Sequence, residues 1–277
     1  MPILHAIVLG IVQGLTEFLP ISSSGHLALF PWLFGWDDFD DPTIEQAFDV
    51  AVHMGTLVAV MGYFRNDIGR LVVGGLRTVR PGGRSLSFDG RFAWLLVLSA
   101  VPAGLAGVLG GDAIEELGDR LWMIALALIV FGFVLFYADK RPSSRRLEQI
   151  NGRDAGGIGL AQTLALQPGV SRSAVTMAAA RWLGFERDAA ARIAFLMSVP
   201  LIAGAGLFKF IDIGGFSGIP SDLRVPFAVG MATSAVTGWL AVWGTLKLIQ
   251  TKTFLPFAIY RIVLGVFVLA LLASPWR

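Results

Sequence analysis

Residues 13–26, QGLTEFLPISSSGH, and residues 168–173, PGVSRS, decide how this sequence folds. Each stretch interrupts a longer apolar run, the first at about residues 3–36 and the second at about residues 155–183. Proline and glycine end a helix at such a point, and a serine can cap the helix that follows. Each run therefore predicts a helix, a turn and a half-helix.

The rest of the chain is dominated by apolar runs of membrane-spanning length. The 277 residues are 55% hydrophobic and 15% charged, with a mean hydropathy of +0.69, whereas soluble domains hold about 25% charged residues. A span needs about 20 apolar residues. Six runs meet this requirement, at about residues 43–64, 92–111, 121–138, 189–211, 225–246 and 256–273. We expect an all-α polytopic membrane protein, with six transmembrane helices and two re-entrant helix-turn-helix hairpins in one domain, 1–277.

Composition also excludes several kinds of site. The chain has no cysteine, which excludes disulfides, thiolate zinc sites and cysteine nucleophiles. Its net charge of +2 is too small to indicate nucleic-acid binding. The first residues lack Lys and Arg, and Gln13 and Glu17 interrupt the apolar run after them, so we expect no cleavable signal peptide.

Loop charges predict the orientation of the spans. Lys and Arg stay in the cytoplasm, and basic residues gather in 65–91 and in 139–154. The loops at 37–41 and 112–119 are acidic, so we place them outside. Both termini are then predicted to lie outside.

An internal repeat agrees with this topology. At an offset of 149 positions, Gln13 aligns with Gln162 and residues 21–24 align with 170–173. Further matches follow in the same order: 92–93 and 99–101 with 227–228 and 234–236, then 129–132 with 262–265. We expect repeat 1 at about 1–138 and repeat 2 at about 155–273. An odd number of spans between them makes the repeats antiparallel, as in inverted-topology folds.

Two hairpins inserted from opposite faces would meet near the membrane midplane. Irregular backbone at that depth is tolerated only in a protein interior or beside a wet cavity. Both second halves begin at serine clusters, so two helix N-termini would point at one place. This arrangement predicts an anion site.

Ionisable residues in the apolar runs support the same site. Glu17, Asp49 and Arg172 would each cost about 2.5 to 3.5 kcal/mol facing lipid, so we expect them to face one another or a polar cavity. Glu17 shares a helix face with Gln13, and Asp49 shares one with His53.

These residue types suit phosphoryl chemistry. Arginine clamps phosphate oxygens in bidentate fashion. A serine with a histidine and a carboxylate nearby can supply an activated nucleophile and a proton donor. Covalent attack by serine and direct attack by water both remain open at this point.

The two stretches also carry a family resemblance. Residues 13–26 and 168–176, PGVSRSAVT, are similar to the two signatures of the bacterial undecaprenyl pyrophosphate phosphatase family, the bacitracin-resistance type. Residues 48–56 and 260–262 also resemble that family. The resemblance implies a hydrolase of the bacterial plasma (inner) membrane that removes the terminal phosphate of undecaprenyl diphosphate and regenerates the lipid carrier for peptidoglycan synthesis. It also implies interlocked re-entrant hairpins and a site open to the outer face.

The resemblance assigns roles to individual residues. It implies acid-base work for Glu17 and His26, nucleophilic attack for Ser23 and phosphate clamping for Arg172. We expect Asp49 and His53 to support the catalytic residues rather than to take part in catalysis directly. Further residues are expected to contact the substrate: Gln13, Ser22, Ser24, Gly169, Ser171, Ser173 and Thr176.

Cofactor and partner expectations follow from the same resemblance. A divalent cation, Mg or Ca, commonly accompanies the family's activity, and no organic cofactor is expected. Gln13 places an amide where relatives can carry a second carboxylate, which argues against a metal site made of two carboxylates. The expected partners are a polyprenyl diphosphate and membrane lipids, and the sequence leaves open whether the chain forms a homodimer.

One function of another class competes. Inverted repeats with broken helices are a transporter architecture, so a secondary transporter or lipid flippase for an anionic substrate is the alternative. Clustering of Glu17, Ser23 and His26 around the anion position favours the hydrolase, because transport alone does not require those groups.

Overall fold

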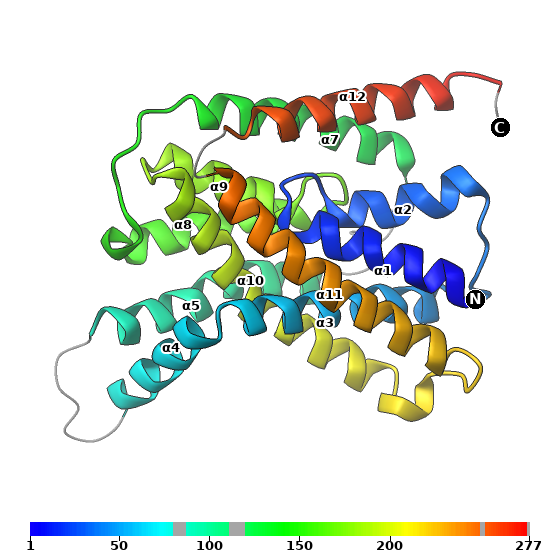
Figure 1. Ribbon diagram of the computed structural model, residues 1–277, viewed down its shortest axis with the longest axis horizontal. Helices are drawn as coiled ribbons and strands as arrows, with labels where there is room; N and C mark the ends of the chain where they lie inside the picture. Colours follow the sequence, from blue (N-terminus) through cyan, green and yellow to red (C-terminus); the bar gives the residue numbers. More distant parts are fainter. Residues whose placement is uncertain (80–86, 111–119, 250–252, 276–277) are drawn as a thin grey trace.

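The computed structural model describes residues 1–79, 87–110, 120–249 and 253–275, and this part of the chain folds into helices without a strand. The acidic loop at 112–119, and Arg80 and Arg84 of the basic stretch, lie outside the described residues. The α-helices are α1 (Ile3–Phe18), α2 (Ser23–Phe34), α3 (Pro42–Tyr63), α4 (Arg65–Thr78), α5 (Phe88–Leu109), α7 (Leu121–Asp139), α8 (Gly152–Gln162), α9 (Arg172–Trp182), α10 (Arg187–Asp212), α11 (Arg224–Ile249) and α12 (Leu255–Leu272) (Figure 1). Short 3-10 turns lie at η1 (Leu147–Gln149), η2 (Thr163–Leu166) and η3 (Gly215–Gly218).

Six of the described helices are long and apolar enough to cross a membrane. They are α3, α5, α7, α10, α11 and α12, and they coincide with the six predicted runs to within a few residues at each end. Many large apolar side chains on them are exposed, as expected where lipid covers the surface. The protein is therefore a multi-pass membrane protein.

Helix α4 was not predicted from the sequence, which indicates only a basic loop there. It packs against α5 through glycines: a Cβ added at Gly74 would lie 2.8 Å from the Gly90 nitrogen. This close approach of two backbones explains how a segment with charged residues such as Arg70 and Asp67 still forms an ordered helix.

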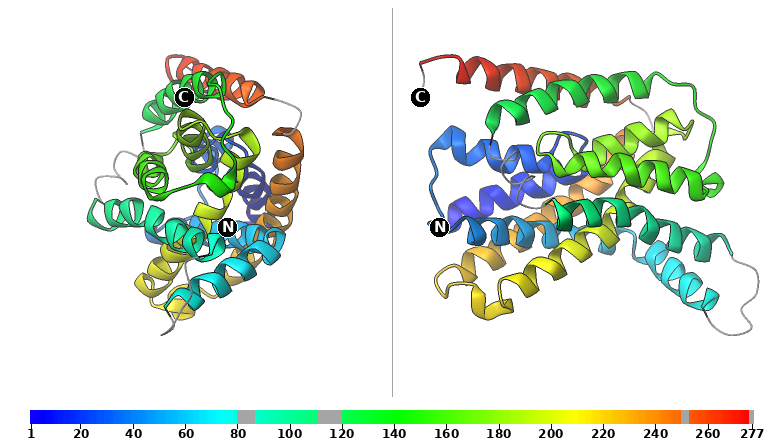
Figure 2. Two further views of the ribbon diagram at one scale, coloured as in Figure 1. Left: turned by 90° about the vertical axis from the view of Figure 1, so that its left-hand side faces the viewer. Right: turned by 180° about the vertical axis from the view of Figure 1, so that it is seen from behind.

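The two interrupted runs each form a pair of helices with the break toward the middle of the molecule. The pair α1 and α2 extends from one end of the molecule, and α8 and α9 extend from the opposite end (Figures 1 and 2). Helices α7 and α12 run alongside each other above both pairs, and α3, α5 and α10 lie below them (Figure 1). Helix α1 begins, and α12 ends, at the same end of the molecule (Figure 2).

Both breaks end on a serine with the same unusual backbone. Ser22 and Ser171 have φ angles of 79° and 71°, and among the described residues they are the non-glycine positions with positive φ. The Ser22 hydroxyl accepts a hydrogen bond from the Gly25 nitrogen at 3.3 Å, and that of Ser171 accepts one from the Ala174 nitrogen at 3.2 Å. Such strain costs about 1 to 3 kcal/mol per residue and is concentrated at functional sites.

The breaks also contact each other directly. The Ser22 hydroxyl accepts a second hydrogen bond from the Gly169 nitrogen at 3.1 Å, and the Ser173 hydroxyl donates to the Leu19 carbonyl at 3.1 Å. Gly169 has a φ of +93°, and a Cβ added there would lie 2.5 Å from the Ile124 carbonyl oxygen. The fold therefore requires glycine at this position, because the break passes against α7.

A fully buried arginine on α12 holds the two breaks together. The Arg261 guanidinium donates to the Pro20 carbonyl at 3.2 Å in the first break. It also donates to the Gly169 and Val170 carbonyls, each at 2.8 Å, in the second break. Irregular backbone leaves carbonyls without helix partners, and Arg261 supplies donors for three of them.

Candidate active site

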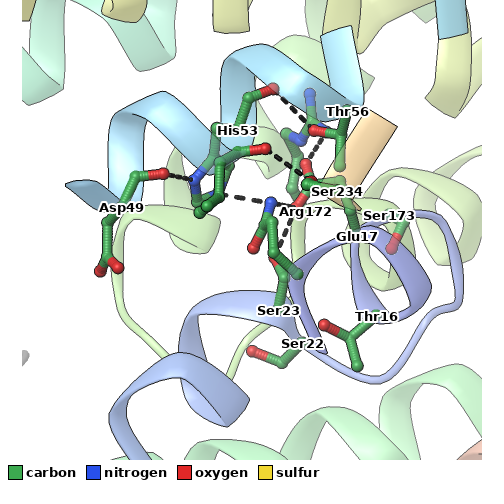
Figure 3. Close-up of polar contacts among 12 residues, drawn as sticks. Thr16, Glu17, Ser22, Ser23, Asp49, His53, Thr56, Arg172, Ser173 and Ser234 are labelled. Atoms are coloured by element: carbon green, nitrogen blue, oxygen red, sulfur yellow. Dashed lines mark hydrogen bonds and ion pairs between the residues drawn. The ribbon is translucent and has the colours of Figure 1, made fainter. Parts of the chain in front are cut away.

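A buried carboxylate lies where the breaks meet. Glu17, in the last turn of α1, is 5% exposed. Its Oε2 accepts hydrogen bonds from the Ser23 hydroxyl at 2.5 Å and from the Gln13 amide at 3.0 Å, and its Oε1 accepts one from Nη2 of Arg172 (Figure 3). One carboxylate therefore gathers side chains from α1, α2 and α9.

The local sequence explains why these groups converge. Gln13 lies one helical turn before Glu17, so both side chains share a face of α1. Ser23 is the first residue of α2, and Arg172 is the first residue of α9. Because each break directs a helix N-terminus inward, the positive ends of both helix dipoles face the same polar centre.

Arg172 retains a donor for a further acceptor. Its side chain is 14% exposed, and its Nη1 is buried with no hydrogen-bond partner among the described residues. An unpaired guanidinium nitrogen in an apolar interior is costly. A phosphate oxygen bound there would satisfy Nη1 while Nη2 stays on Glu17.

His53 also reaches Glu17, although the sequence places it only in a supporting position. Its Nε2 lies 3.6 Å from Oε2 of Glu17. Its Nδ1 lies 2.7 Å from the backbone carbonyl oxygen of Asp49. The Asp49 carboxylate points away from this cluster (Figure 3), and Asp49 lines a small pocket of about 50 Å³ with Glu45 and Asp38.

His26 lies in a different environment. Its Nδ1 is 2.6 Å from the Ser22 carbonyl, and its Nε2 is 2.7 Å from the Tyr260 hydroxyl. Its ring stacks on that tyrosine and is 4% exposed. Among the described residues no hydrogen bond or ion pair joins it to Glu17, so the structure groups Glu17, Ser23 and Arg172 without His26.

The remaining predicted residues divide into those that hold the breaks and those that border the site. Ser22, Ser171 and Ser173 use their hydroxyls in the cap and cross-break contacts, and Ser171 and Ser173 bond each other at 3.2 Å. The Thr176 hydroxyl donates to the Arg172 carbonyl at 2.6 Å. Ser24 lies half-buried in the first turn of α2.

The described residues do not fit a metal ion held by protein ligands alone. They contain no group of three His, Cys, Asp or Glu side chains suited to that role. Both carboxylate oxygens of Glu17 already accept hydrogen bonds, and the donor to Oε1 is the cationic Arg172. A positive neighbour at that distance disfavours a second cation.

Sequence reasoning did not identify the role of Arg261 or Tyr260. The available signal was an arginine inside the apolar run 256–273, which is as costly facing lipid as Arg172. A buried arginine without a nearby carboxylate in the sequence indicates carbonyl partners, and the two breaks are where such carbonyls occur.

Comparisons with known proteins identify the family of this chain. The family model described as "Bacitracin resistance protein BacA" matches residues 6–267. A protein of Geobacter sulfurreducens named undecaprenyl-diphosphatase is 47% identical over 275 residues, which is 98% of this chain and 99% of that protein. Proteins with the same name from Desulforudis audaxviator and Thermomicrobium roseum are 47% and 45% identical, over 97% of this chain and 98% of each of theirs. By its match to the family model over nearly its whole length, this chain belongs to the bacitracin resistance protein BacA family.

Proposed function

We propose that this protein hydrolyses undecaprenyl diphosphate to undecaprenyl phosphate and inorganic phosphate, which recycles the lipid carrier for cell-wall synthesis. The observation that carries the proposal is the contact of Glu17 with both Ser23 and Arg172. It combines a carboxylate base, a hydroxyl and a phosphate-binding cation in a membrane interior, and the similar proteins are named for this activity.

The geometry supports a separate role for each of Glu17, Ser23 and Arg172. Arg172 binds oxygens of the terminal phosphate through Nη1, and the N-termini of α2 and α9 stabilise the charge that develops there. Glu17 takes the proton of the attacking group, either the Ser23 hydroxyl or a water in its place. A new P–O bond forms, the bond to the bridging oxygen breaks, and its electron pair leaves with the lipid monophosphate. Where Ser23 is the attacking group, a water then cleaves the P–O bond of the phosphoserine, which releases inorganic phosphate and restores the hydroxyl.

We propose that the helix pairs are two re-entrant hairpins of an inverted repeat within one domain. Equivalent contacts support this: α1 packs on α11 as α8 packs on α5. A Cβ added at Gly10 would lie 2.5 Å from the Gly230 carbonyl oxygen, and one at Gly159 would lie 2.5 Å from that of Ser99. Gly10 and Gly159 are separated by the same offset of 149 positions as Ser22 and Ser171.

Location and partners complete the proposal. We place the protein in the bacterial plasma membrane with both termini outside and the site open to the outer face, on the loop charges and the family resemblance. A divalent cation would be bound through the diphosphate oxygens of the substrate, because the described residues supply no three-ligand group.

Phosphate release tests the proposed function. The purified protein in detergent should release inorganic phosphate from a polyprenyl diphosphate and leave the monophosphate intact. Lipid analysis of the same reaction separates the hydrolase from the alternative. Binding or transbilayer movement of the diphosphate without phosphate release would favour the transporter or flippase.

A further inference from the structure

The chain has three histidines, and the structure describes each of them. His5 stacks on Trp36 and pairs with Asp38 at 2.8 Å, near the start of α1. His26 has both ring nitrogens occupied by partners other than Glu17. His53 is therefore the histidine whose ring reaches the carboxylate of the proposed site.

The hydrogen bond at Nδ1 of His53 fixes the protonation state of Nε2, the ring nitrogen that faces Glu17. Nδ1 lies 2.7 Å from the carbonyl oxygen of Asp49, and a carbonyl oxygen can only accept. Nδ1 therefore carries a hydrogen. In the neutral ring Nε2 is then the unprotonated nitrogen, and it faces Oε2 of Glu17 at 3.6 Å.

Oε2 is also the oxygen that would receive the proton of the nucleophile, because the Ser23 hydroxyl donates to it. A carboxylate that remains paired with an arginine retains a proton poorly. For turnover the proton has to leave Glu17, and the Nε2 of His53 is the neighbouring base placed to take it.

Few other charged groups face this ring. Glu17 faces it from α1, with Arg172 of α9 behind that carboxylate, and Asp49 lies one turn away on α3 itself. From α10, Lys209 reaches α3 but bonds Gln46 at 3.1 Å and pairs with Asp212. Helix α11 contributes the Ser234 hydroxyl, which donates to the Val52 carbonyl.

His53 is also more exposed than the buried carboxylate that it faces. Its side chain is 27% exposed, against 4% for that of Glu17. Asp49, one helical turn from His53, lines the pocket of about 50 Å³, and Glu45, Asp37 and Asp38 also line it. Carboxylates repel phosphate and attract cations, so this pocket suits the exit of protons rather than that of the product anion.

We propose that His53 is a proton-relay residue: its Nε2 takes from Glu17 the proton lost by the nucleophile and releases it to water that reaches the partly exposed ring. This inference rests on the proposed hydrolase function. The proton moves from the attacking oxygen to Oε2 of Glu17, then to Nε2 of His53 and then to water, and Glu17 and His53 return to their starting forms.

The pH dependence of phosphate release tests the relay. In the wild type kcat/KM should fall on the acid side, because protonated His53 cannot accept a proton. His53→Gln should lower the plateau by about 10²-fold or more, the contribution of a positioned acid-base group, and remove that acid limb. His26→Gln should retain the acid limb at any plateau value of kcat/KM. His5→Gln should retain both the acid limb and the wild-type plateau.

Chemical rescue gives a second measurement. Added imidazole should restore part of the activity of His53→Ala, in proportion to the imidazole base present, and should not restore His26→Ala. An acid limb that persists in His53→Gln but disappears in His26→Gln would overturn the relay. So would rescue of the His26 variant alone.

A wild-type experiment covers the case in which the His53 variants do not fold. With diethyl pyrocarbonate, loss of activity should follow modification of the peptide that contains His53, and loss that follows the His26 peptide would contradict the relay. Absence of phosphate release from unmodified wild type would instead reject the proposed function, and the relay with it.

Discussion

Arg172→Lys should lower kcat/KM for phosphate release by about 10²- to 10³-fold, the loss typical when one charge-stabilising donor is removed from a transition state. Lysine keeps the positive charge, but it cannot donate to Glu17 and to a phosphate oxygen through one planar group. In the structure Nη2 bonds Glu17 while Nη1 has no partner among the described residues. Arg172→Ala should lose at least as much, because Glu17 is then left buried without its cation.

Arg192→Lys is the matched control for this prediction. Arg192 pairs with Asp188 on the surface of α10, where the two side chains are 36% and 42% exposed. Such pairs contribute about 0 to 1 kcal/mol, so this variant should keep wild-type phosphate release and stability. Full activity of a folded Arg172→Ala protein would contradict the assignment of Arg172 to the phosphate.

Glu17→Gln should lower kcat by about 10²- to 10⁴-fold, the usual contribution of a positioned general base. The amide has nearly the size of the carboxylate and can still accept the hydrogen bond of Ser23. It cannot take that proton, and it leaves the charge of Arg172 without a counterion. Phosphate release under saturating substrate measures the change, with thermal unfolding in detergent as the check on folding.

Glu148→Gln provides the control for that substitution. Glu148 is an exposed residue of η1, outside both breaks. Removal of its charge should change neither activity nor stability. A Glu17→Gln protein as active as Glu148→Gln would exclude Glu17 as the base.

Much of the fold could be predicted because hydropathy reports directly on what lipid tolerates. The six spans are apolar over about 20 residues. Pro20, Pro168 and Gly169 predict the breaks, and the serines that follow them in the sequence predict the helix caps. The pairing of Glu17 with Arg172 could be predicted as well, because a charged side chain that faces lipid carries a free-energy cost of several kcal/mol.

The parts that could not be predicted depend on how helices rotate and approach one another. Whether His26 or His53 reaches Glu17 is decided by the hydrogen bonds of their Nδ1 atoms, to Ser22 and to Asp49, which turn the two rings in different directions. The role of Arg261 depends on carbonyls from two breaks that are far apart in sequence. Helix α4 depends on a glycine contact with α5.

The most direct test is a structure of the protein with a polyprenyl methylene-diphosphonate, in which carbon replaces the bridging oxygen that hydrolysis would release. The terminal phosphonate should lie within hydrogen-bond distance of Nη1 of Arg172 and beside the Ser23 hydroxyl, with Glu17 still holding Nη2. A headgroup bound away from Arg172, with the guanidinium and Glu17 unchanged, would show that the meeting point of the two breaks does not bind phosphate.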